Sequence, residues 1–224
     1  MSLDKRKTDP VLGEEVYQYL IKNKVETPLL STCKTPERKI EIITEKFSSI
    51  LETMGLDCKD DNLTRTAERV AKMYVLETLW GLDYANFPKV TTFNNKMKYS
   101  AMVVERSINV VTICSHHWQN IIGKCSIAYV PNDRILGLSK LHRVVEFFCR
   151  QPQVQERLVE QIYFALSYIL HTEDIAITII AKHFCVIARG VEDHTSDTVT
   201  TRLGGCFMED GAVRNEYYTA LKLN

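Results

Sequence analysis

The stretch that decides the fold lies near the middle of the chain and reads MVVERSINVVTICSHHWQNIIGKCSIAYV (102–130). Its first part is rich in Val, Ile and Thr, and its last part has two alternating rows of side chains from Ile121 to Tyr129. Both patterns are typical of β-strands. We therefore expect two strands here, with Cys114-Ser115-His116-His117 where the first one ends.

The segments after residue 130 complete a definite order of elements. Apolar residues recur at helical spacing over 138–148 and 154–169, and strand patterns return at 175–182 and 198–207. Residues 185–188 are a candidate extension of the third strand, and 215–223 suit a short C-terminal helix. The order β-β-α-α-β-β predicts an α+β fold, an antiparallel four-stranded sheet with two helices packed on one face.

Three helical patterns precede the first strand. They cover about 11–20, 36–55 and 63–79, and Thr35-Pro36 has the sequence of a helix start, an N-cap followed by proline. We therefore divide the chain into an N-terminal helical region, residues 1–96, and a second domain, residues 97–224.

The charge balance excludes some classes of partner. The chain has 28 Lys and Arg against 28 Asp and Glu, so its formal net charge is zero. A binder of nucleic acid or of a membrane surface needs a clustered excess of cations, so we expect neither partner. No apolar run approaches the ~20 residues of a membrane helix, and the first residues lack the apolar stretch of a signal peptide. Seven cysteines without the spacing of a disulfide framework then favour the reducing cytoplasm.

The strongest chemical signal is a set of cysteines and histidines in two short segments. Cys114-x-x-His117 on a turn can aim a thiolate and an imidazole at one tetrahedral ion, and Cys185 can supply a third ligand. His116 and His183 stand beside these residues and are the remaining candidates for a fourth ligand. Three protein ligands and one open position are typical of catalytic zinc.

Most cysteines in such elements are small buried apolar residues rather than ligands. We apply this interpretation to the other five, which are Cys33, Cys58, Cys125, Cys149 and Cys206.

Two further motifs suit a nucleotide. Ser139, Lys140 and Arg143 lie at a predicted helix start, where backbone N–H groups and two cations suit an oligophosphate. Glu156 follows Pro152, which we expect to begin the next helix, and its carboxylate suits the N1–H and exocyclic amine of guanine. Taken alone, each motif is at least as typical of a solvated helix surface.

In this order, the segments resemble those of the GTP cyclohydrolase I family. The matching stretches are AKMYV (71–75), GLDYANFPK (81–89), CSHH (114–117), GLSK (137–140), QPQVQER (151–157), HFC (183–185) and RGVEDHTS (189–196). The resemblance covers about residues 25–207.

The resemblance implies a tunnelling fold (T-fold), in which the sheets of several subunits close into a barrel and active sites lie between subunits. It implies a homodecamer of two facing pentamers, with the N-terminal region serving assembly. The implied reaction is zinc-dependent and converts GTP and water to 7,8-dihydroneopterin triphosphate and formate, the first step of pterin and tetrahydrofolate biosynthesis.

The resemblance also implies roles by position. The residues that match zinc ligands are Cys114, His117 and Cys185, and those that match the guanine-holding pair are Gln155 and Glu156. The residues that match triphosphate contacts are Lys140, Arg143, Arg189 and, from a neighbouring subunit, Arg69. The residues that match proton-handling groups are His116, Ser139 and His183, the last placed to protonate purine N7.

Some positions depart from the family pattern. Ser115 stands where the family usually has Glu, Ala67 where it has Pro, and Trp118 where it has a smaller apolar residue. A serine orients a neighbouring histidine less well than a carboxylate does, so rate and stability are in question more than reaction type. Two other interpretations stay open. One is a deazaguanine nitrile reductase of related fold, with a cysteine nucleophile and a nicotinamide cofactor; the other is a non-catalytic subunit that binds zinc or a pterin.

Overall fold

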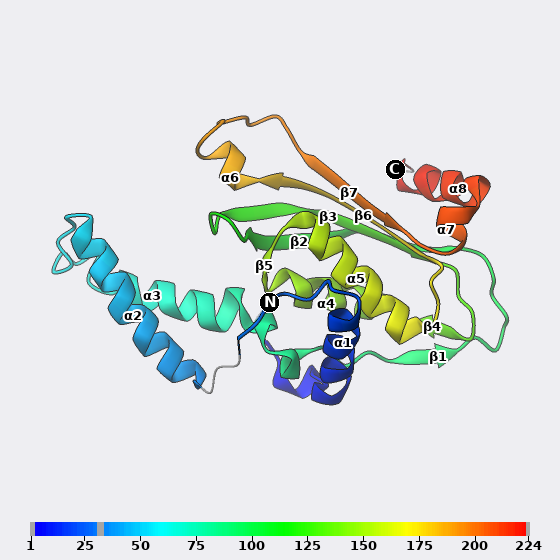
Figure 1. Ribbon diagram of the computed structural model, residues 1–224, viewed down its shortest axis with the longest axis horizontal. Coiled ribbons are helices and arrows are strands. Elements are labelled where there is room, and N and C mark those ends of the chain that lie inside the picture. Colours follow the sequence, from blue (N-terminus) through cyan, green and yellow to red (C-terminus); the bar gives the residue numbers. More distant parts are fainter. Residues whose placement is uncertain (1–2, 31–33, 223–224) are drawn as a thin grey trace.

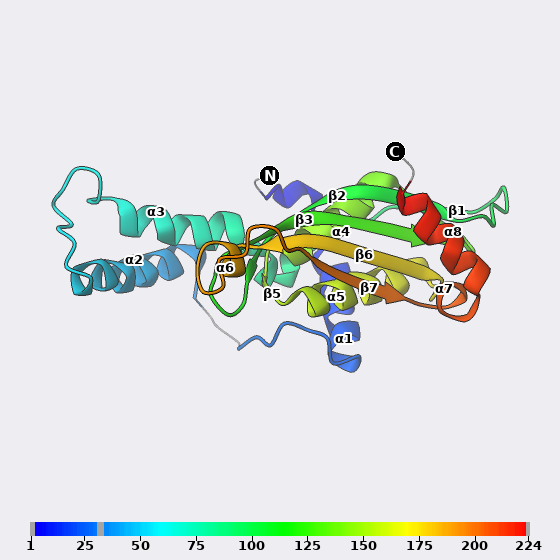
Figure 2. The ribbon, with the colours of Figure 1, turned by 90° about the horizontal axis from the view of Figure 1, so that it is seen from above.

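A five-stranded sheet forms the centre of the molecule (Figures 1 and 2). The computed structural model describes residues 3–30 and 34–222. Strand order is β5-β2-β3-β6-β7. The four longer strands pair antiparallel and are β2 (Val103–Cys114), β3 (Asn120–Tyr129), β6 (Ile175–His183) and β7 (Thr198–Leu203). The expected α+β order with four antiparallel strands is therefore confirmed.

Two small features were not expected from the sequence. The two-residue strand β5 (Pro152–Gln153) pairs parallel with the last residues of β2. A separate antiparallel pair is made by β1 (Thr92–Asn94) and β4 (Arg134–Leu136). Of the two, β5 has the larger consequence, because it fixes the start of the following helix beside the end of β2.

Helices α4 (Leu138–Cys149) and α5 (Gln155–Leu170) cover one face of the sheet, and α1 (Pro10–Lys22) packs against α5 (Figure 1). Strand side chains alternate between faces. Ile127 therefore joins the main core beneath α4 and α5, while its neighbour Ala128 joins a second cluster on the opposite face. That second cluster contains Phe207 and Tyr217 from α7 (Cys206–Glu209) and α8 (Gly211–Lys222).

A helical hairpin projects away from the sheet (Figure 1). It is built from α2 (Pro36–Thr53) and α3 (Thr66–Lys72), which continues as the π-helix η2 (Met73–Thr78). The expected start of α2 is confirmed, because Thr35 accepts a hydrogen bond from the backbone N–H of Arg38 at 3.3 Å. Short 3₁₀ turns are η1 (Lys5–Lys7), η3 (Trp80–Leu82) and η4 (Tyr84–Asn86). Across the described residues, each helix is too short or too polar to cross a membrane.

The sequence prediction was wrong about the segments that follow β6 and β7. Residues 185–188 do not extend β6, because the chain turns into the short helix α6 (Phe184–Ile187), where the N–H of Ala188 donates to Phe184 O at 2.8 Å. Strand β7 ends at Leu203 rather than near residue 207. Gly205, at φ 46°, supplies a backbone conformation that ends the strand and begins α7.

Pro152 was also misplaced by the sequence prediction. It lies in β5, and α5 begins at Gln155. Two contacts from β2 and the turn after it keep this segment extended: Thr112 Oγ1 donates to Gln151 O at 2.9 Å, and the N–H of Ser115 donates to Gln153 O at 2.8 Å. A long-range contact therefore overrides the local preference of proline for a helix start.

The remaining predictions concern the C-terminal helix and the other cysteines. The C-terminal helix begins at Gly211, earlier than expected, and residue 223 lies outside the described residues. The interpretation of the other cysteines as buried holds for Cys125 and Cys149, whereas Cys58 and Cys206 are partly exposed. Cys33 lies outside the described residues.

Candidate active site

Three segments meet at one end of the sheet. β2 ends at Cys114, β6 ends at His183, and the following α6 carries Cys185. β3 lies between β2 and β6 and holds both ends in register, because both pair with its first residues. One ligand atom from each of Cys114, His183 and Cys185 lies within 4.8 Å of the other two. Residues 114–117 and 183–185 are far apart in the sequence, and the fold brings Cys114 and Cys185 together.

The turn after Cys114 is tightly held. The N–H of Cys114 donates to Gln119 O at 2.8 Å, and the N–H of Trp118 donates to Cys114 O at 2.9 Å. Trp118 has a positive φ of 53°, and its ring meets the ring of Tyr74 in η2 edge-on, with centroids 5.1 Å apart. These contacts fix the direction in which the buried thiol of Cys114 points.

The two thiols affect each other electrostatically. Burial raises the pKa of Cys185, and the neighbouring Cys114 raises it further. Two thiols so close cannot both ionise easily unless a cation neutralises them. Two sulfurs and an imidazole are also the donors that zinc prefers, so these residues fit a zinc ion.

His183 is oriented by Gln155. The amide Nε2 of Gln155 donates to Ile179 O at 3.1 Å and to Thr198 O at 2.9 Å, and carbonyl oxygens only accept. Gln155 Oε1 must therefore face His183, whose Nε2 donates to it at 2.8 Å. Burial lowers the pKa of His183. The ring is thus a neutral imidazole near pH 7, with its Nδ1 lone pair free of this hydrogen bond.

The two histidines of the turn have different neighbours. His116 Nδ1 lies 3.7 Å from Cys114 Sγ. His117 Nε2 accepts a hydrogen bond from Arg189 Nη1 at 2.9 Å. His117, the histidine that the sequence predicts as a ligand, is thus on the correct turn but outside the group that contains Cys114, His183 and Cys185.

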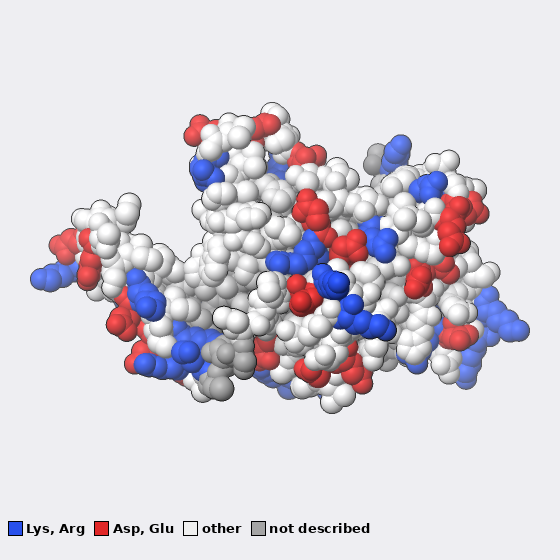
Figure 3. Space-filling model, viewed as in Figure 1, with Lys and Arg blue, Asp and Glu red and all other residues white. Residues whose placement is uncertain are grey.

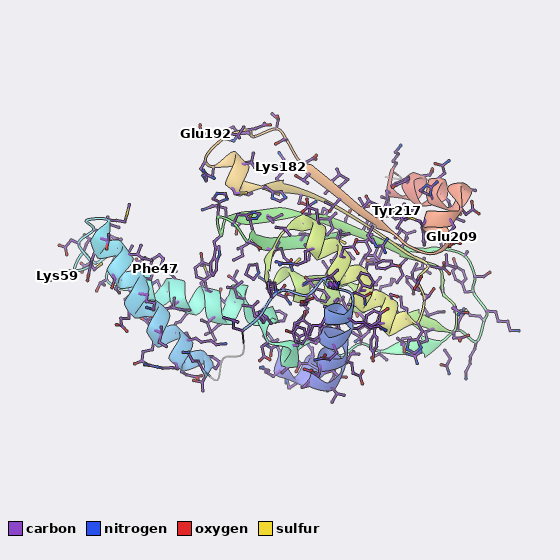
Figure 4. All side chains as sticks on the ribbon, in the orientation of Figure 1. Phe47, Lys59, Lys182, Glu192, Glu209 and Tyr217 are labelled. Atoms are coloured by element: carbon purple, nitrogen blue, oxygen red, sulfur yellow. The ribbon has the colours of Figure 1, made fainter. Side chains whose placement is uncertain are left out.

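The loop that carries Arg189 is tied to this end of the sheet. Figure 4 labels Lys182 in β6 and Glu192 in the loop, both at this end. Lys182 Nζ donates to His194 O at 3.2 Å. Hydrogen bonds from Thr195 lower the pKa of Asp193 to about 2. The loop therefore has internal bonds of its own and a bond to β6.

The start of α5 lies beside the same group. Glu156 is exposed in the first turn, and its charge acts on His183. Gln155 is only 1% exposed, and its amide is fully engaged with β6 and β7. Neighbouring positions on this helix thus point in different directions: Glu156 is open to a ligand, while Gln155 holds His183.

The predicted phosphate contacts at the start of α4 lie far from the group that contains Cys114, His183 and Cys185. The N–H of Leu136, just before α4, donates to the hydroxyl of Tyr129, which ends β3. The metal-ligand group lies at the other end of β3, and ten residues of strand span roughly 30 Å. Ser139 and Arg143 line a cavity of about 520 Å³ together with the N-terminal segment. A single chain therefore does not bring Ser139, Lys140 and Arg143 to Cys114, and Arg69 lies on the projecting α3.

Comparison with known proteins decides the family. The family model described as GTP cyclohydrolase I matches residues 43–222. A protein named GTP cyclohydrolase 1 from Aeromonas hydrophila is 50% identical over 198 residues, which are 88% of this chain and 91% of that protein. The chain belongs to the GTP cyclohydrolase I family.

Other relatives agree. A protein named GTP cyclohydrolase 1 from Haemophilus ducreyi is 47% identical, over 92% of this chain and 94% of that protein. A protein of the same name from Vibrio cholerae is 48% identical, over 88% of this chain and 91% of that protein. A solved structure of dihydroneopterin aldolase from Burkholderia thailendensis bound to guanine matches with a TM-score of 0.31 and 10% identity, over 50% of this chain and 97% of that one. The assignment to GTP cyclohydrolase I rests on the sequence matches, and the fold is the T-fold of that family.

The structure shows what Ser115 does where a GTP cyclohydrolase I usually has Glu. Its hydroxyl accepts a hydrogen bond from Arg157 Nη2 at 3.3 Å, and the same nitrogen donates to Pro152 O at 2.6 Å. Burial lowers the pKa of Arg157. The half-buried guanidinium of Arg157 therefore links the turn after Cys114 to β5. Sequence reasoning missed this role of Arg157, although it lies inside a quoted motif, because nothing local indicates the partner of an arginine.

Proposed function

We propose that this chain converts GTP and water to 7,8-dihydroneopterin triphosphate and formate, the first step of pterin and tetrahydrofolate biosynthesis. The observation that carries the proposal is the meeting of Cys114, His183 and Cys185 beside Glu156 in a member of this family. Family membership also favours this function over a nitrile reductase or a non-catalytic subunit.

Zinc is the cofactor that we propose for this site, held by Cys114, His117 and Cys185. When bound, zinc lowers the pKa of a water molecule toward about 7 and so supplies a nucleophile for purine C8. His117 Nε2 accepts a hydrogen bond from Arg189, so this nitrogen carries a lone pair of the kind that a zinc ion takes. Its release of Arg189 would free that guanidinium for a phosphate.

His183 is the proton donor that we propose for purine N7. Its Nε2–H is committed to Gln155, so Nδ1 is the nitrogen that takes up and delivers the proton. The lowered pKa makes the protonated ring a stronger acid than a free imidazole. Because His183 also lies in the Cys114–Cys185 group, it is the alternative third ligand, and zinc content of variants separates the two roles.

Glu156 is the guanine contact that we propose, since its carboxylate can accept from N1–H and the exocyclic amine together. The exposed position of Glu156 in the first turn of α5 supports this role. A direct contact of Gln155 with guanine stays a prediction, because its amide bonds β6, β7 and His183.

The triphosphate end of the site requires a second chain. Arg189 lies at the metal end, while Ser139, Lys140 and Arg143 lie at the opposite end of the same sheet. We therefore propose that neighbouring chains complete each site, with Arg69 from a projecting hairpin, in a homodecamer. The exposed apolar side chains of that hairpin, among them Ile50, Met54 and Leu76, support assembly through it.

Two groups remain as proton carriers for the later sugar steps, His116 and Ser139. His116 lies against Cys114, and Ser139 is exposed at the start of α4. We assign both to ribose opening and rearrangement without dividing the steps between them.

The surface and the cysteines support the remaining expectations. In the view of Figure 3, Lys and Arg are interspersed with Asp and Glu, without a broad face of one sign. The cysteines among the described residues are free thiols, in keeping with the cytoplasm as the proposed location.

The test is an assay of GTP consumption. We expect formate and 7,8-dihydroneopterin triphosphate, the latter followed by its absorbance, to form in equal amounts. The formation of both should stop after a chelator removes zinc. His117→Ala should lose zinc, whereas His183→Ala should keep zinc and lose formate production. Formate from the metal-free chain would contradict the proposal, and loss of zinc from His183→Ala alone would move the third ligand to His183.

A further inference from the structure

A buried threonine, Thr27, lies at the centre of a polar network that ends at the turn after Cys114. Thr27 follows α1 in irregular chain, yet it is only 5% exposed. Its hydroxyl donates to Gln151 Oε1 at 2.6 Å and accepts from Gln161 Nε2 at 3.1 Å. Residues separated by more than 120 positions in sequence therefore share one hydroxyl.

Each amide in this network has only one orientation that satisfies its partners. Gln151 Nε2 donates to Gly81 O at 2.8 Å, so Gln151 Oε1 must be the atom that faces Thr27. Gln161 uses its nitrogen for Thr27, so its Oε1 accepts from Gln153 Nε2 at 2.8 Å. All three glutamines are fully buried. If one hydrogen-bond partner is removed, water can take its place only after the structure changes.

The network leads directly to the turn that presents Cys114. Gln151 and Gln153 flank Pro152 in the segment that forms β5, beside the last residues of β2. Gln151 O accepts from Thr112 Oγ1, and Gln153 O accepts from the N–H of Ser115, at 2.9 and 2.8 Å. Thr112 and Ser115, which lie on either side of Cys114, are thus hydrogen-bonded to Gln151 and to Gln153 of β5.

Arg157 closes the path on its other side. Its Nε donates to Gln153 Oε1 at 3.3 Å, and its Nη2 donates to Ser115 Oγ at 3.3 Å. A serine offers this guanidinium a weaker partner than a carboxylate would. The turn therefore depends more heavily on the position of β5, which the Thr27 network sets.

We propose that Thr27 is a positioning residue for the metal site: its hydroxyl fixes Gln151 and Gln161, and through β5 it fixes the direction of the Cys114 thiol. The inference rests on the proposed zinc site. It assigns to the segment after α1 a role in metal affinity that lies outside the ligands and outside the substrate contacts.

The experiment compares Thr27→Val with Thr27→Ser in the full chain. Valine keeps the shape and removes the hydroxyl, whereas serine keeps the hydroxyl. Loss of groups that orient metal ligands weakens metal affinity by about 10- to 100-fold, and we expect the lower end, ~10-fold, for Thr27→Val. The zinc Kd is measured by competition with a chromogenic chelator, and the visible spectrum of the cobalt-substituted site reports its geometry. Thr27→Ser should return both to wild type.

Tyr217→Phe is the control for a general loss of stability. Tyr217 is fully buried, and its hydroxyl donates to Thr178 Oγ1 at 2.8 Å, in the cluster beneath α7 and α8 (Figure 4). This variant also loses one buried hydroxyl, and we expect a lower Tm with an unchanged zinc Kd. Gln161→Met interrupts the same path one residue further along and should weaken zinc as Thr27→Val does, which keeps the test available if Thr27→Val does not fold.

The outcomes are distinct. Weaker zinc binding and a changed cobalt spectrum in Thr27→Val and Gln161→Met, but not in Tyr217→Phe, support the role. A wild-type zinc Kd in either network variant, or an equal loss in Tyr217→Phe, overturns it. If the wild-type chain itself binds no zinc, the proposed function fails, which is a separate result.

Discussion

The two ends of the central sheet bury different kinds of side chain. At the end that carries Cys114 and His183, the sheet and its helices bury a group of uncharged polar side chains, which are Thr27, Thr112, Gln151, Gln153, Gln155 and Gln161. At the other end, α7 and α8 cover the sheet with a compact apolar cluster around Phe207 and Tyr217. Apolar packing is non-directional, whereas hydrogen bonds fix orientation. Hydrogen bonds thus dominate at the end that carries Cys114, whereas apolar packing dominates beneath α7 and α8, where Tyr217 also donates one buried hydrogen bond to Thr178.

Removal of a proposed metal ligand should give the largest difference between the two ends. Cys185→Ala deletes one of the two thiols, and a bound metal contributes several kcal/mol of transition-state stabilisation, so formate production should fall about 1,000-fold. Bound zinc, measured by atomic emission, should fall in parallel. Cys58→Ala is the matched control, because Cys58 is partly exposed and lies outside the ligand group. Full activity in Cys185→Ala would contradict the assignment of this end as the active site.

Gln155→Leu tests whether activity depends on the orientation of His183. Leucine keeps the volume but leaves the Nε2–H of His183 without its acceptor. We expect kcat to fall by about 10- to 100-fold with zinc still bound, because an orienting partner rather than a ligand is lost. Gln155→Glu, which keeps an acceptor for His183, should recover part of the rate. Equal kcat in Gln155→Leu and wild type would mean that His183 needs no orientation.

Phe207→Leu tests the opposite end. Phe207 is fully buried, and a shape change in a packed core typically lowers the free energy of unfolding by about 1–1.5 kcal/mol. Denaturant unfolding should show this loss, while kcat and bound zinc stay at wild-type values. A fall in zinc content would show that the two ends are coupled.

Thiol chemistry gives the smallest and most local test. Burial raises the pKa of Cys149 to about 12, so its thiol stays protonated between pH 7 and 9. Cys149 should therefore resist alkylation between pH 7 and 9 in the folded chain. Cys185 also has a raised pKa, so once a chelator has removed zinc its alkylation should speed up as pH rises. Peptide mass mapping checks both, with Cys58 as the accessible reference; rapid labelling of Cys149 in the folded chain would contradict its burial.

The features that the sequence predicted are those set by local pattern. The strand and helix order follows from residue periodicity, and the start of α2 follows from Thr35 and its proline. The meeting of Cys114 with Cys185 was also predicted, because both lie where strand patterns end.

The features that the sequence missed depend on contacts between distant residues. Pro152 lies in a strand because of Thr112 and Ser115, which are remote in sequence. Gln155, which the resemblance places in the guanine-holding pair, is bonded to His183, and no local pattern indicates where an amide will find its partners. The separation of Lys140 from Cys114 within one chain likewise depends on topology, and the homodecamer that we propose is what would bring the two together.

The most direct test of the central claim is a zinc titration of the metal-free chain with GTP present. We expect the rate of formate release to rise in proportion to bound zinc and to reach its maximum at one zinc ion per chain. A rate that is already maximal in the metal-free chain, or that does not follow zinc occupancy, would contradict it.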